Sequence, residues 1–501
     1  MLAVDQGSSS SRCVVLDDQL RPVALAAAPV ASSYPAPGWV EHDPAELVTS
    51  VLASMASALA AAGASWPDVA AVGLAAQTET FVVWDRATGT AVYPAISWRD
   101  GRAAAACDGL RAAGREDRIR AVTGLPLGPA FSAAKLRWLL DEIPGGQRRA
   151  AAGELAFGDV CSWLTWQLSG GAGHVTEPSM AARTMLFDLA GGDWSAELLA
   201  EFGLPAALRP AIGPTAGRLA VTDPGVCGGR AVVGASIGDQ PAALFGQRCW
   251  SAGTAKLTLG TGAFLWCHAG TVPPAAVPDG VVSSCAWRLP GETAYALEGF
   301  VPNAGGVTTW LRQIGALTAD AWPVITDSAA GGSGGLWCVP ALFGLGTPHW
   351  DAAATADITG LTPASTAADL AEAAMLGVVH QVADAIDAVA AGLPAPLRLV
   401  RADGGLAGND SVLQAIADLA GISLERPAVT EATALGAGAL AGLGTGLWDR
   451  AALAAMPFAS GPTVTPALPA GRRAVARSGW SQALARARAR WQQAGPPAAV
   501  S

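Results

Sequence analysis

Asp5-Gln6-Gly7-Ser8-Ser9-Ser10-Ser11-Arg12 links two short apolar runs, residues 2–5 (LAVD) and 12–17 (RCVVLD). The two runs read as buried strands, and the segment between them reads as a tight turn. Glycine permits such a turn, and its backbone N–H groups and hydroxyls can hold phosphate oxygens. Asp5 could ligate Mg²⁺ directly or through water. Taken alone this signal is weak, because most Gly-Ser turns only reverse the chain, and the Gly-Lys-Ser/Thr element of a Walker loop is missing.

The same pattern recurs in the second half of the chain. Residues 256–259 and 263–267 read as strands that flank Gly260-Thr261-Gly262. A third Gly-rich stretch, residues 403–409 (DGGLAGN), follows a predicted strand and precedes a predicted helix, where backbone can approach a nucleotide closely. Three such turns, two of them in matching places, predict a nucleotide held between two related domains.

Gly238-Asp239-Gln240 lies between a predicted strand, AVVGAS at 231–236, and an apparent helix. A carboxylate at the end of a strand in the presumed cleft is a candidate general base, because phosphoryl transfer needs a group that accepts the proton of the attacking hydroxyl. The alternative is that Asp239 only caps the following helix.

The whole chain alternates predicted strands with predicted helices, which is typical of α/β domains. Its 501 residues suggest at least two domains. The restart of the pattern places the boundaries at 1–248 for a first domain, 249–448 for a second, and 449–501 for an extension with a surface helix near 478–494.

Composition excludes several classes of function. The formal net charge of −10 argues against nucleic acid as a main partner, since phosphate binding requires a basic face. Eight scattered cysteines form no disulfide framework, and neither a targeting segment nor a membrane span is expected, so we expect a cytoplasmic protein. No GxGxxG opens a helix after the first strand, which excludes a dinucleotide oxidoreductase.

These motifs together resemble the FGGY carbohydrate kinases, and within them the glycerol kinase branch. The similarity runs from Leu2 to about Trp448. It rests on residues 5–12 (DQGSSSSR), 38–44 (GWVEHDP), 82–89 (VVWDRATG), 131–142 (FSAAKLRWLLDE), 238–247 (GDQPAALFGQ), 255–264 (AKLTLGTGAF), 403–409 (DGGLAGN) and 425–443 (ERPAVTEATALGAGALAGL). The resemblance implies an actin-like ATPase fold, in which two RNase H-like α/β domains enclose a cleft.

The resemblance also implies roles for individual residues, with ATP and Mg²⁺ as cofactors. Asp239 would be the general base, and Asp5 and Asp239 would hold the metal. The first phosphate turn would comprise Asp5, Gly7, Ser8, Ser9, Ser10 and Arg12, and the second Gly260 and Thr261. The adenosine would lie against Gly305, Thr309, Gly405 and Asn409. The polyol would contact Thr78, Glu79, Trp98, Ala130, Asp239, Gln240 and Phe264.

Two positions depart from the glycerol kinase pattern. Glycerol kinases carry Arg-Glu where this chain has Thr78-Glu79, and a Tyr where it has Ala130. Each lost charge-assisted hydrogen bond is worth roughly 1.5–3 kcal/mol, so glycerol would be held less tightly. We therefore expect a three-carbon polyol to leave Glu79 and Gln240 partly unpaired or bridged by water, in a pocket that suits a longer ligand.

The sequence thus predicts an ATP-dependent kinase that phosphorylates a hydroxyl of a small polyol or sugar. Glycerol stays open as the substrate beside a longer polyol or a ketose, such as a polyol of four or five carbons or a xylulose-type sugar. A non-catalytic ATP-binding regulator is a remote alternative, which would not need Asp239. The assembly is expected to be a homodimer or a homotetramer, and the sequence does not decide between them. Lys135 and Lys256, the only lysines, both lie within matched motifs, in functional or structural roles.

Overall fold

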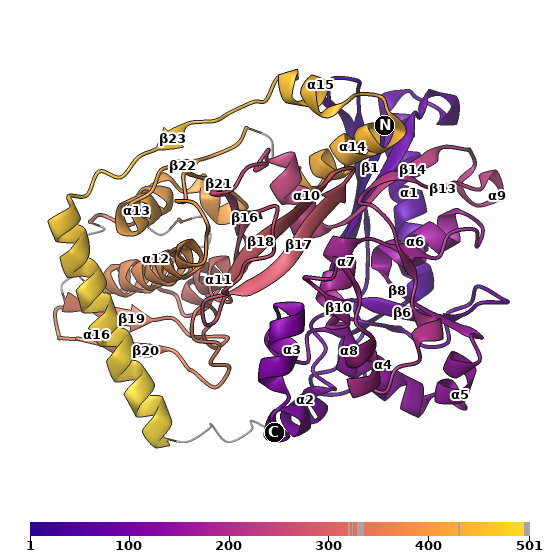
Figure 1. The fold of residues 1–501 in the computed structure, drawn as a ribbon. Helices are drawn as coiled ribbons and strands as arrows, with labels where there is room; N and C mark the ends of the chain where they lie inside the picture. Colours follow the sequence, from indigo (N-terminus) through magenta and orange to yellow (C-terminus); the bar gives the residue numbers. More distant parts are fainter. Residues whose placement is uncertain (319–320, 323, 328–334, 429–430, 495–501) are drawn as a thin grey trace.

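The computed structural model describes residues 1–318, 321–322, 324–327, 335–428 and 431–494. Residues 429–430, at the start of the last matched motif, and residues 495–501 of the predicted extension lie outside this described part. The chain forms two halves, each built around one mixed β-sheet that helices cover (Figure 1).

The first half contains a sheet of six strands in the order β13-β14-β5-β1-β2-β3. Its strands are β1 (Leu2–Gln6), β2 (Ser10–Leu16), β3 (Pro22–Pro29), β5 (Ala71–Ala76), β13 (Ala216–Val221) and β14 (Val232–Gly238). Strands β1, β5 and β14 run parallel, whereas β2 and β3 are antiparallel to their neighbours. The predicted strand–turn–strand unit at the N-terminus is therefore confirmed as β1 and β2.

The second half contains a sheet of seven strands in the order β17-β18-β16-β15-β21-β22-β23. Its strands are β15 (Thr254–Leu259), β16 (Ala263–Gly270), β17 (Val282–Leu289), β18 (Glu292–Val301), β21 (Leu399–Asp403), β22 (Leu424–Glu425) and β23 (Thr463–Val464). β15 pairs antiparallel with β16 and parallel with β21, as β1 pairs with β2 and β5. The run β18-β16-β15-β21-β22 thus repeats β3-β2-β1-β5-β14, and the predicted relation between the two halves is confirmed.

Helices cover both sheets. Those of the first half are α1 (Pro44–Ala62), α2 (Ala104–Ala112), α3 (Glu116–Thr123), α4 (Ser132–Glu142), α5 (Gly146–Ala151), α6 (Val160–Leu168), α7 (Pro178–Ala181), α8 (Ala196–Glu201), α9 (Pro224–Cys227) and α10 (Asp239–Gly246). Those that follow are α11 (Gly305–Gln313), α12 (Ala367–Ala391), α13 (Asp410–Ala420), α14 (Ala432–Thr445), α15 (Arg450–Ala455) and α16 (Ala470–Ala494).

Short strands complete the fold. In the first half β4 (Glu41–His42), β6 (Phe81–Asp85), β7 (Ala95–Ile96) and β8 (Leu155–Asp159) form a sheet, and β9 (Val175–Thr176), β10 (Phe187–Asp188), β11 (Asp193–Trp194) and β12 (Ala211–Ile212) form two pairs. In the second half β19 (Trp337–Val339) pairs with β20 (Asp357–Thr359).

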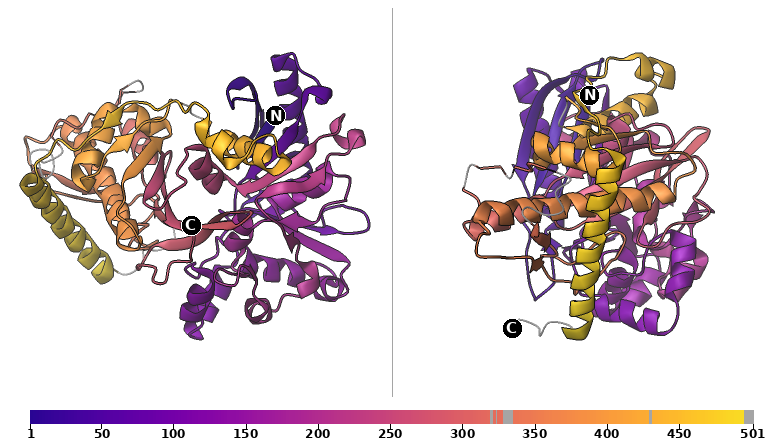
Figure 2. Two further views of the ribbon diagram at one scale, coloured as in Figure 1. Left: turned by 45° about the horizontal axis from the view of Figure 1, so that its top comes forward. Right: turned by 90° about the vertical axis from the view of Figure 1, so that its left-hand side faces the viewer.

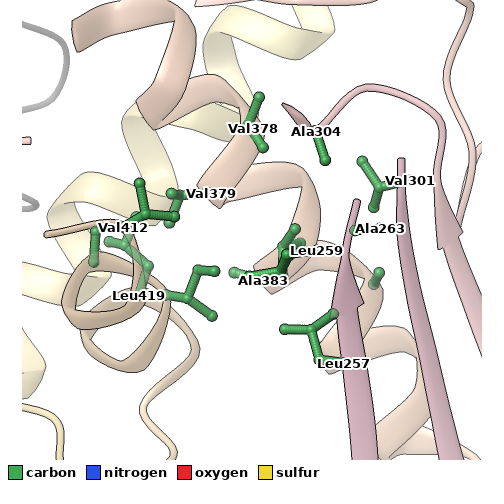
Figure 3. Packing of buried hydrophobic residues seen from close by; sticks show 14 of the residues in the cluster. Leu257, Leu259, Ala263, Val301, Ala304, Val378, Val379, Ala383, Val412 and Leu419 are labelled. Atoms are coloured by element: carbon green, nitrogen blue, oxygen red, sulfur yellow. The ribbon is translucent and has the colours of Figure 1, made fainter. Parts of the chain in front are cut away.

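The core of the second half explains why the turn after β15 is held rigidly. Leu257 and Leu259 of β15 are buried against Ala383 of α12 and against side chains of α13 such as Leu419 (Figure 3). Every residue of α12 from Ala373 to Ala383 is buried, so the middle of the helix is enclosed on all sides by the core of the second half. This packing fixes the end of β15, where the second predicted phosphate turn begins.

Helix α14 crosses back to the first half. It packs against α10 and β5 although it follows β22 in the chain, and it lies beside the N-terminus in Figure 1. The approach is close because Gly436 has no side chain: a Cβ there would lie 1.9 Å from the carbonyl oxygen of Ala242. Helix α16 instead lies at the outer edge of the second half (Figure 2), where Trp480 and Leu484 are buried.

Two described helices, α1 and α12, have the length and hydropathy of a membrane span. In α12, 78% of the most apolar window is buried inside the protein, and in α1 44% is buried. Helix α1 packs against β2 and β3, and α12 packs against β18 and α13. Their apolar faces are therefore used in the packing of the two halves.

Candidate active site

The predicted site residues of the first half gather where three parallel strands end. Gln6 of β1, Ala76 of β5 and Gly238 of β14 are neighbours in register. The residues just before or after them are Asp5 on β1, Thr78 and Glu79 after β5, and Asp239 after β14. Ligands of open α/β sheets bind outside the carboxyl ends of the strands, so the topology brings these side chains to one binding edge.

Asp5 and Asp239 form a pair of half-buried carboxyl groups. Burial, followed by the nearby charge of Asp239, raises the pKa of Asp5 to about 7. Burial raises the pKa of Asp239 to about 6, and the charge of Lys256 opposes this rise. Two carboxylates in one apolar surrounding repel each other, so a cation between them would be favoured.

Asp239 does not cap helix α10. The N-cap position falls on Gly238, and Asp239 is the first residue of the helix. Its Oδ1 accepts a hydrogen bond of 2.7 Å from the adjacent backbone N–H of Gln240 rather than from the next turn. The capping alternative is therefore wrong, and the carboxylate needs another explanation.

Lys256 is the cation at the centre of the site. It is fully buried in β15, and its Nζ donates to the Oε1 of Gln240 and, at 2.9 Å, to the hydroxyl of Thr258. Burial lowers its pKa, while the charges of Asp403, Asp239 and Glu298 act in the opposite direction. An ammonium group thus lies among carboxylates from both halves.

Glu79 already has two hydrogen-bond partners within the protein. The hydroxyl of Thr78 donates to its Oε2 at 2.6 Å, and Nε of Arg183 donates to its Oε1 at 2.5 Å. Gln240 is likewise held by Lys256. Arg183 and Lys256 are partners of Glu79 and Gln240 that the sequence did not predict. The expectation that a three-carbon polyol leaves these two side chains partly unpaired or bridged by water stays a prediction.

Trp98 and Ala130 belong to loops that hydrogen bonds from other parts of the first half hold in place. Nε1 of Trp98 donates to the hydroxyl of Ser8 at 2.9 Å, which itself donates to Oε1 of Gln77 at 3.1 Å. The carbonyls of Ser97 and Ala130 both accept hydrogen bonds of 2.7 Å from Nζ of the buried Lys135. Lys135 therefore positions two predicted polyol residues rather than facing solvent.

The second predicted phosphate turn lies at the start of helix α11. The N–H of Gly260 donates to the carbonyl of Gly262 at 2.9 Å, and the carbonyl of Gly260 accepts from Gly305 at 2.8 Å. Thr261 is exposed, and Thr309 is exposed one turn into the helix. The structure thus brings Gly260, Thr261 and Gly305 together, and the N–H groups of Gly305 and Gly306 at the start of α11 donate to the carbonyls of Gly260 and Thr261.

The DGG turn lies against the same strand end. Gly404 has a φ of +88°, and a Cβ there would lie 2.6 Å from the carbonyl oxygen of Leu259. Gly405 has open space where its side chain would be. Asn409 accepts from the N–H groups of Ser411 and Val412, and so caps α13.

The remaining predicted residues lie at the rim of the site. Ser9 is exposed in the first turn, and the carbonyl of Ser10 accepts the N–H of Gly7 at 2.9 Å. Arg12 is exposed and lies 3.6 Å from a carboxylate oxygen of Glu431, which precedes α14. Phe264 stacks on its strand partner Phe300, with ring centroids 4.8 Å apart.

Sequence reasoning assigned no role in the site to Arg183, Glu298 or Gln247. Arg183 bridges Glu79 and Glu298, and the side-chain amide of Gln247 donates to Asp403, whose other carboxylate oxygen is buried without a hydrogen-bond partner among the described residues. The signal for Arg183 was present: it is the one charge between Glu177 and Asp188, in a largely apolar stretch. A lone cation in such a stretch indicates a buried charge with partners elsewhere.

The donor set fits a magnesium ion that is shared with phosphates. Among the described residues there is no group of three or more His, Cys, Asp or Glu side chains that could hold a metal alone. Mg²⁺ is usually held by one or two carboxylates together with substrate phosphates and water. The pair Asp5 and Asp239, whose pKa values are both raised, meets that description.

Two related halves with phosphate-type turns, and with carboxylates between them, define a phosphotransferase of the actin-like ATPase class. The N-terminal domain model of the FGGY family of carbohydrate kinases matches residues 1–246, and the C-terminal domain model of that family matches residues 255–445. The chain belongs to the FGGY family of carbohydrate kinases, and it is an ATP-dependent kinase of a sugar or polyol.

Individual relatives agree with this assignment. The glycerol kinase of Aromatoleum aromaticum is 44% identical over 489 residues, which cover 97% of this chain and 98% of the relative. The glycerol kinase of Thermus brockianus is 43% identical over 495 residues, which cover 99% of each.

Solved structures show the same fold. Plasmodium falciparum glycerol kinase with ADP has a TM-score of 0.90 at 26% identity, over 97% of each chain. A ligand-bound xylulose kinase from Lactobacillus acidophilus has a TM-score of 0.84 at 20% identity, over 97% of each chain. The predicted fold of two actin-like domains is therefore confirmed.

Proposed function

We propose that this kinase transfers the γ-phosphoryl group of ATP to a hydroxyl of glycerol. The observation that carries the proposal is the pair of half-buried carboxyl groups, Asp5 and Asp239, at the ends of parallel strands of one half, both with raised pKa values. The phosphate-type turn of the other half begins at Gly260. The names of full-length relatives at 42–44% identity favour glycerol as the substrate.

In this proposal Asp239 is the general base. Its carboxylate accepts the proton of the attacking hydroxyl as the new P–O bond forms and the bond to the leaving ADP oxygen breaks. A pKa of about 6 suits this task, because the group is largely ionised at neutral pH and still basic enough to take a proton. Lys256, close by, keeps the ionised form accessible despite burial.

Asp5 and Asp239 are also the residues that would hold Mg²⁺. The metal, when bound, would neutralise charge on the phosphate oxygens. In the same proposal the first turn, with Gly7, Ser8, Ser9, Ser10 and Arg12, and the second turn, with Gly260 and Thr261, hold the phosphates. The adenosine lies against Gly305, Thr309, Gly405 and Asn409.

The polyol is assigned to Thr78, Glu79, Trp98, Ala130, Gln240 and Phe264. Oxygens of Glu79 and Gln240 accept hydrogen bonds from the polyol hydroxyls, and each carboxylate oxygen of Glu79 can accept a second hydrogen bond beside those from Thr78 and Arg183. The side chain of Phe264, stacked on Phe300, offers an apolar surface to the carbon chain.

A longer polyol or a ketose is the second candidate. Thr78 and Ala130 are small where glycerol kinases carry Arg and Tyr, which favours a ligand with more carbons. The hydrogen-bond partners that Glu79 and Gln240 already have weaken this argument, because a ligand with more carbons is not needed to pair these two side chains. Glycerol is therefore the first candidate.

We further propose a cytoplasmic enzyme with no membrane span and no nucleic-acid partner, acting as a homodimer or homotetramer. The acidic net charge of −10 supports the absence of a nucleic-acid partner, and the buried faces of α1 and α12 support the absence of a span.

An ATP-consumption screen tests the proposal. Purified protein with Mg²⁺ is offered polyols and sugars of three to six carbons, one at a time. We expect the highest kcat/KM for glycerol. A higher value for a longer polyol or ketose would favour the second candidate, and no turnover with any of them would refute the proposed function.

A further inference from the structure

A buried arginine joins two buried carboxylates at the floor of the site. Nε of Arg183 donates to Oε1 of Glu79 at 2.5 Å, and its Nη1 donates to Oε2 of Glu298 at 2.7 Å. The three side chains are 7–9% exposed. The guanidinium lies 5.5 Å from the ring centroid of Phe131 and 5.7 Å from that of Trp266, so water has little access to it.

The bridge connects the two halves of the protein. Glu79 follows β5, and Arg183 lies in the 3-10 turn Ala182–Thr184 that follows α7. Glu298 belongs to β18 of the second sheet, which pairs with β17. In β17 the N–H of Ser283 donates to the carbonyl of Gly124 in the first half at 3.0 Å. The bridge therefore lies where the second half rests on the first.

Glu79 is held in an uncommon backbone conformation. Its φ is +60°, in the left-handed region that side chains other than glycine rarely adopt. The hydroxyl of Ser132 donates to its carbonyl at 3.0 Å, while Thr78 and Arg183 fix its carboxylate. Such strain persists when surrounding contacts over-determine it, as happens at ligand-binding positions.

Buried charges are a costly way to gain stability. Taking an ion pair out of water costs solvation energy, and well-packed apolar residues often stabilise a fold as well or better. The planar fork of arginine can donate to two carboxylates in fixed directions, which the single ammonium of a lysine cannot reproduce. The arrangement therefore favours a role in orientation over a role in stability alone.

We propose that Arg183 is a positioning residue of the polyol site, which orients Glu79 for the ligand and couples it to the second half through Glu298. The inference rests on the proposed function, since Glu79 matters only if a polyol binds there. Lys256 extends this series of alternating negative and positive side chains, because the charges of Glu298, Asp239 and Asp403 all act on it. Binding of a ligand to Glu79 and the position of the second half relative to the first then influence each other reciprocally.

The test compares variants at the two ends of the bridge. Glu298→Gln keeps a hydrogen-bond acceptor but removes the charge, and Arg183→Lys keeps the charge but removes the fork. We expect KM for the polyol to rise about fivefold or more in each, with KM for ATP within about twofold of the unmodified value. The double variant should be no worse than Arg183→Lys alone, because both changes break one interaction.

Arg477→Lys is the matched control. Arg477 also pairs with two carboxylates, Asp384 and Asp387, but it lies on α16 at the outer edge of the second half. Its replacement should leave both KM values unchanged. If Glu298→Gln, Arg183→Lys and Arg477→Lys all lowered the melting temperature equally and none of them changed KM for the polyol, the inference would be overturned. An unmodified enzyme that turns over no polyol or sugar would instead refute the proposed function.

Discussion

The indole Nε1 of Trp98 donates a 2.9 Å hydrogen bond to the hydroxyl of Ser8. Trp98 is assigned to the polyol and Ser8 to the first phosphate turn, so one hydrogen bond joins the two binding regions. Ser8 in turn donates to Gln77, which precedes Thr78 and Glu79. A change in either region is therefore transmitted to the other through a short polar contact.

Removal of this contact should affect both substrates. Trp98→Phe keeps an aromatic ring but loses the donor, and we expect KM for polyol and for ATP each to rise by about fivefold, the scale of one net hydrogen bond. Steady-state kinetics with each substrate varied in turn would measure this. Ser8→Ala should give a similar result, and the two changes together should be less than additive. A change in polyol KM alone would contradict the coupling.

Replacement of the proposed base should slow turnover strongly without weakening the binding of ATP. We expect Asp239→Asn to lower kcat by roughly 10² or more, with ATP affinity little changed, because the amide cannot accept the hydroxyl proton. Asp449→Asn is the control, since Asp449 is a true N-cap whose carboxylate accepts from Ala452 at 2.8 Å. If both variants kept turnover near that of the unmodified enzyme, Asp239 would not be the base.

The pH dependence of activity should report the same group. The base must be ionised, and its pKa lies near 6, so kcat/KM should fall as the pH drops below about 6. Because Asp5 must also be ionised to hold Mg²⁺, the acidic limb should have a slope of about 1 to 2 in the unmodified enzyme. Initial rates between pH 5 and pH 8 would measure it, and a flat profile down to pH 5 would contradict the assignment.

The raised pKa of Asp5 should also make the stability of the protein depend on pH. The folded pKa of Asp5, about 7, lies above that of an unfolded aspartate, roughly 3.9, so the folded state binds the proton more tightly. Its stabilising contribution is present at low pH and is lost as the pH rises toward 7. Asp5→Asn should therefore raise the melting temperature at pH 8, by about 2–4 °C per kcal/mol, and change it little at pH 5. If Asp5→Asn melted at a lower temperature than the unmodified protein at pH 8, the sign of this effect would be refuted.

Much of the fold could be predicted from the sequence because its signals are local. The Gly turns after residues 2–5 and 256–259 lie within a few residues of the strands that they join, and the structure confirms both units. The return of α14 to the first half could not be predicted in this way. Its small residues, such as Gly436, indicate close packing but do not say against which partner.

In the candidate site, too, local sequence signals predicted some residues, whereas others are brought together only by the fold. Asp5 and Asp239 could be proposed from the sequence because each lies at the end of an apolar strand, and parallel pairing then brings these strand ends together. Arg183 was missed because its partners Glu79 and Glu298 lie 104 and 115 residues away along the chain. No local pattern encodes such distances, and only the packing of the two halves brings the three charges into contact.

Lys135 should be needed for polyol binding although it does not reach the ligand position itself. Lys135→Met leaves the carbonyls of Ser97 and Ala130 without their donor, at a cost of roughly 1–3 kcal/mol for each buried group. We expect a higher KM for polyol and a lower melting temperature. Arg137→Met, on the exposed face of the same helix α4, should change neither by much. Equal effects of the two changes would contradict the positioning role.

The substitutions at positions 78 and 130 should set how long a substrate the site accepts. Thr78 and Ala130 leave space that the Arg and Tyr of glycerol kinases fill, while Glu79 stays oriented by Thr78 and Arg183. Thr78→Arg with Ala130→Tyr should therefore raise the preference for glycerol over a longer polyol by about tenfold, which corresponds to roughly 1.4 kcal/mol.

Single changes should do less than the pair, because both side chains would contact one ligand. The measurement is the ratio of kcat/KM for glycerol to that for the best longer polyol, in the unmodified enzyme and in each variant. Thr78→Ser, which keeps the hydroxyl that donates to Glu79, is the control and should leave the ratio unchanged. If the double variant lost the longer polyol and glycerol equally, these two positions would not determine chain length, and the bridge between Glu79 and Arg183 would be the stronger determinant of selectivity.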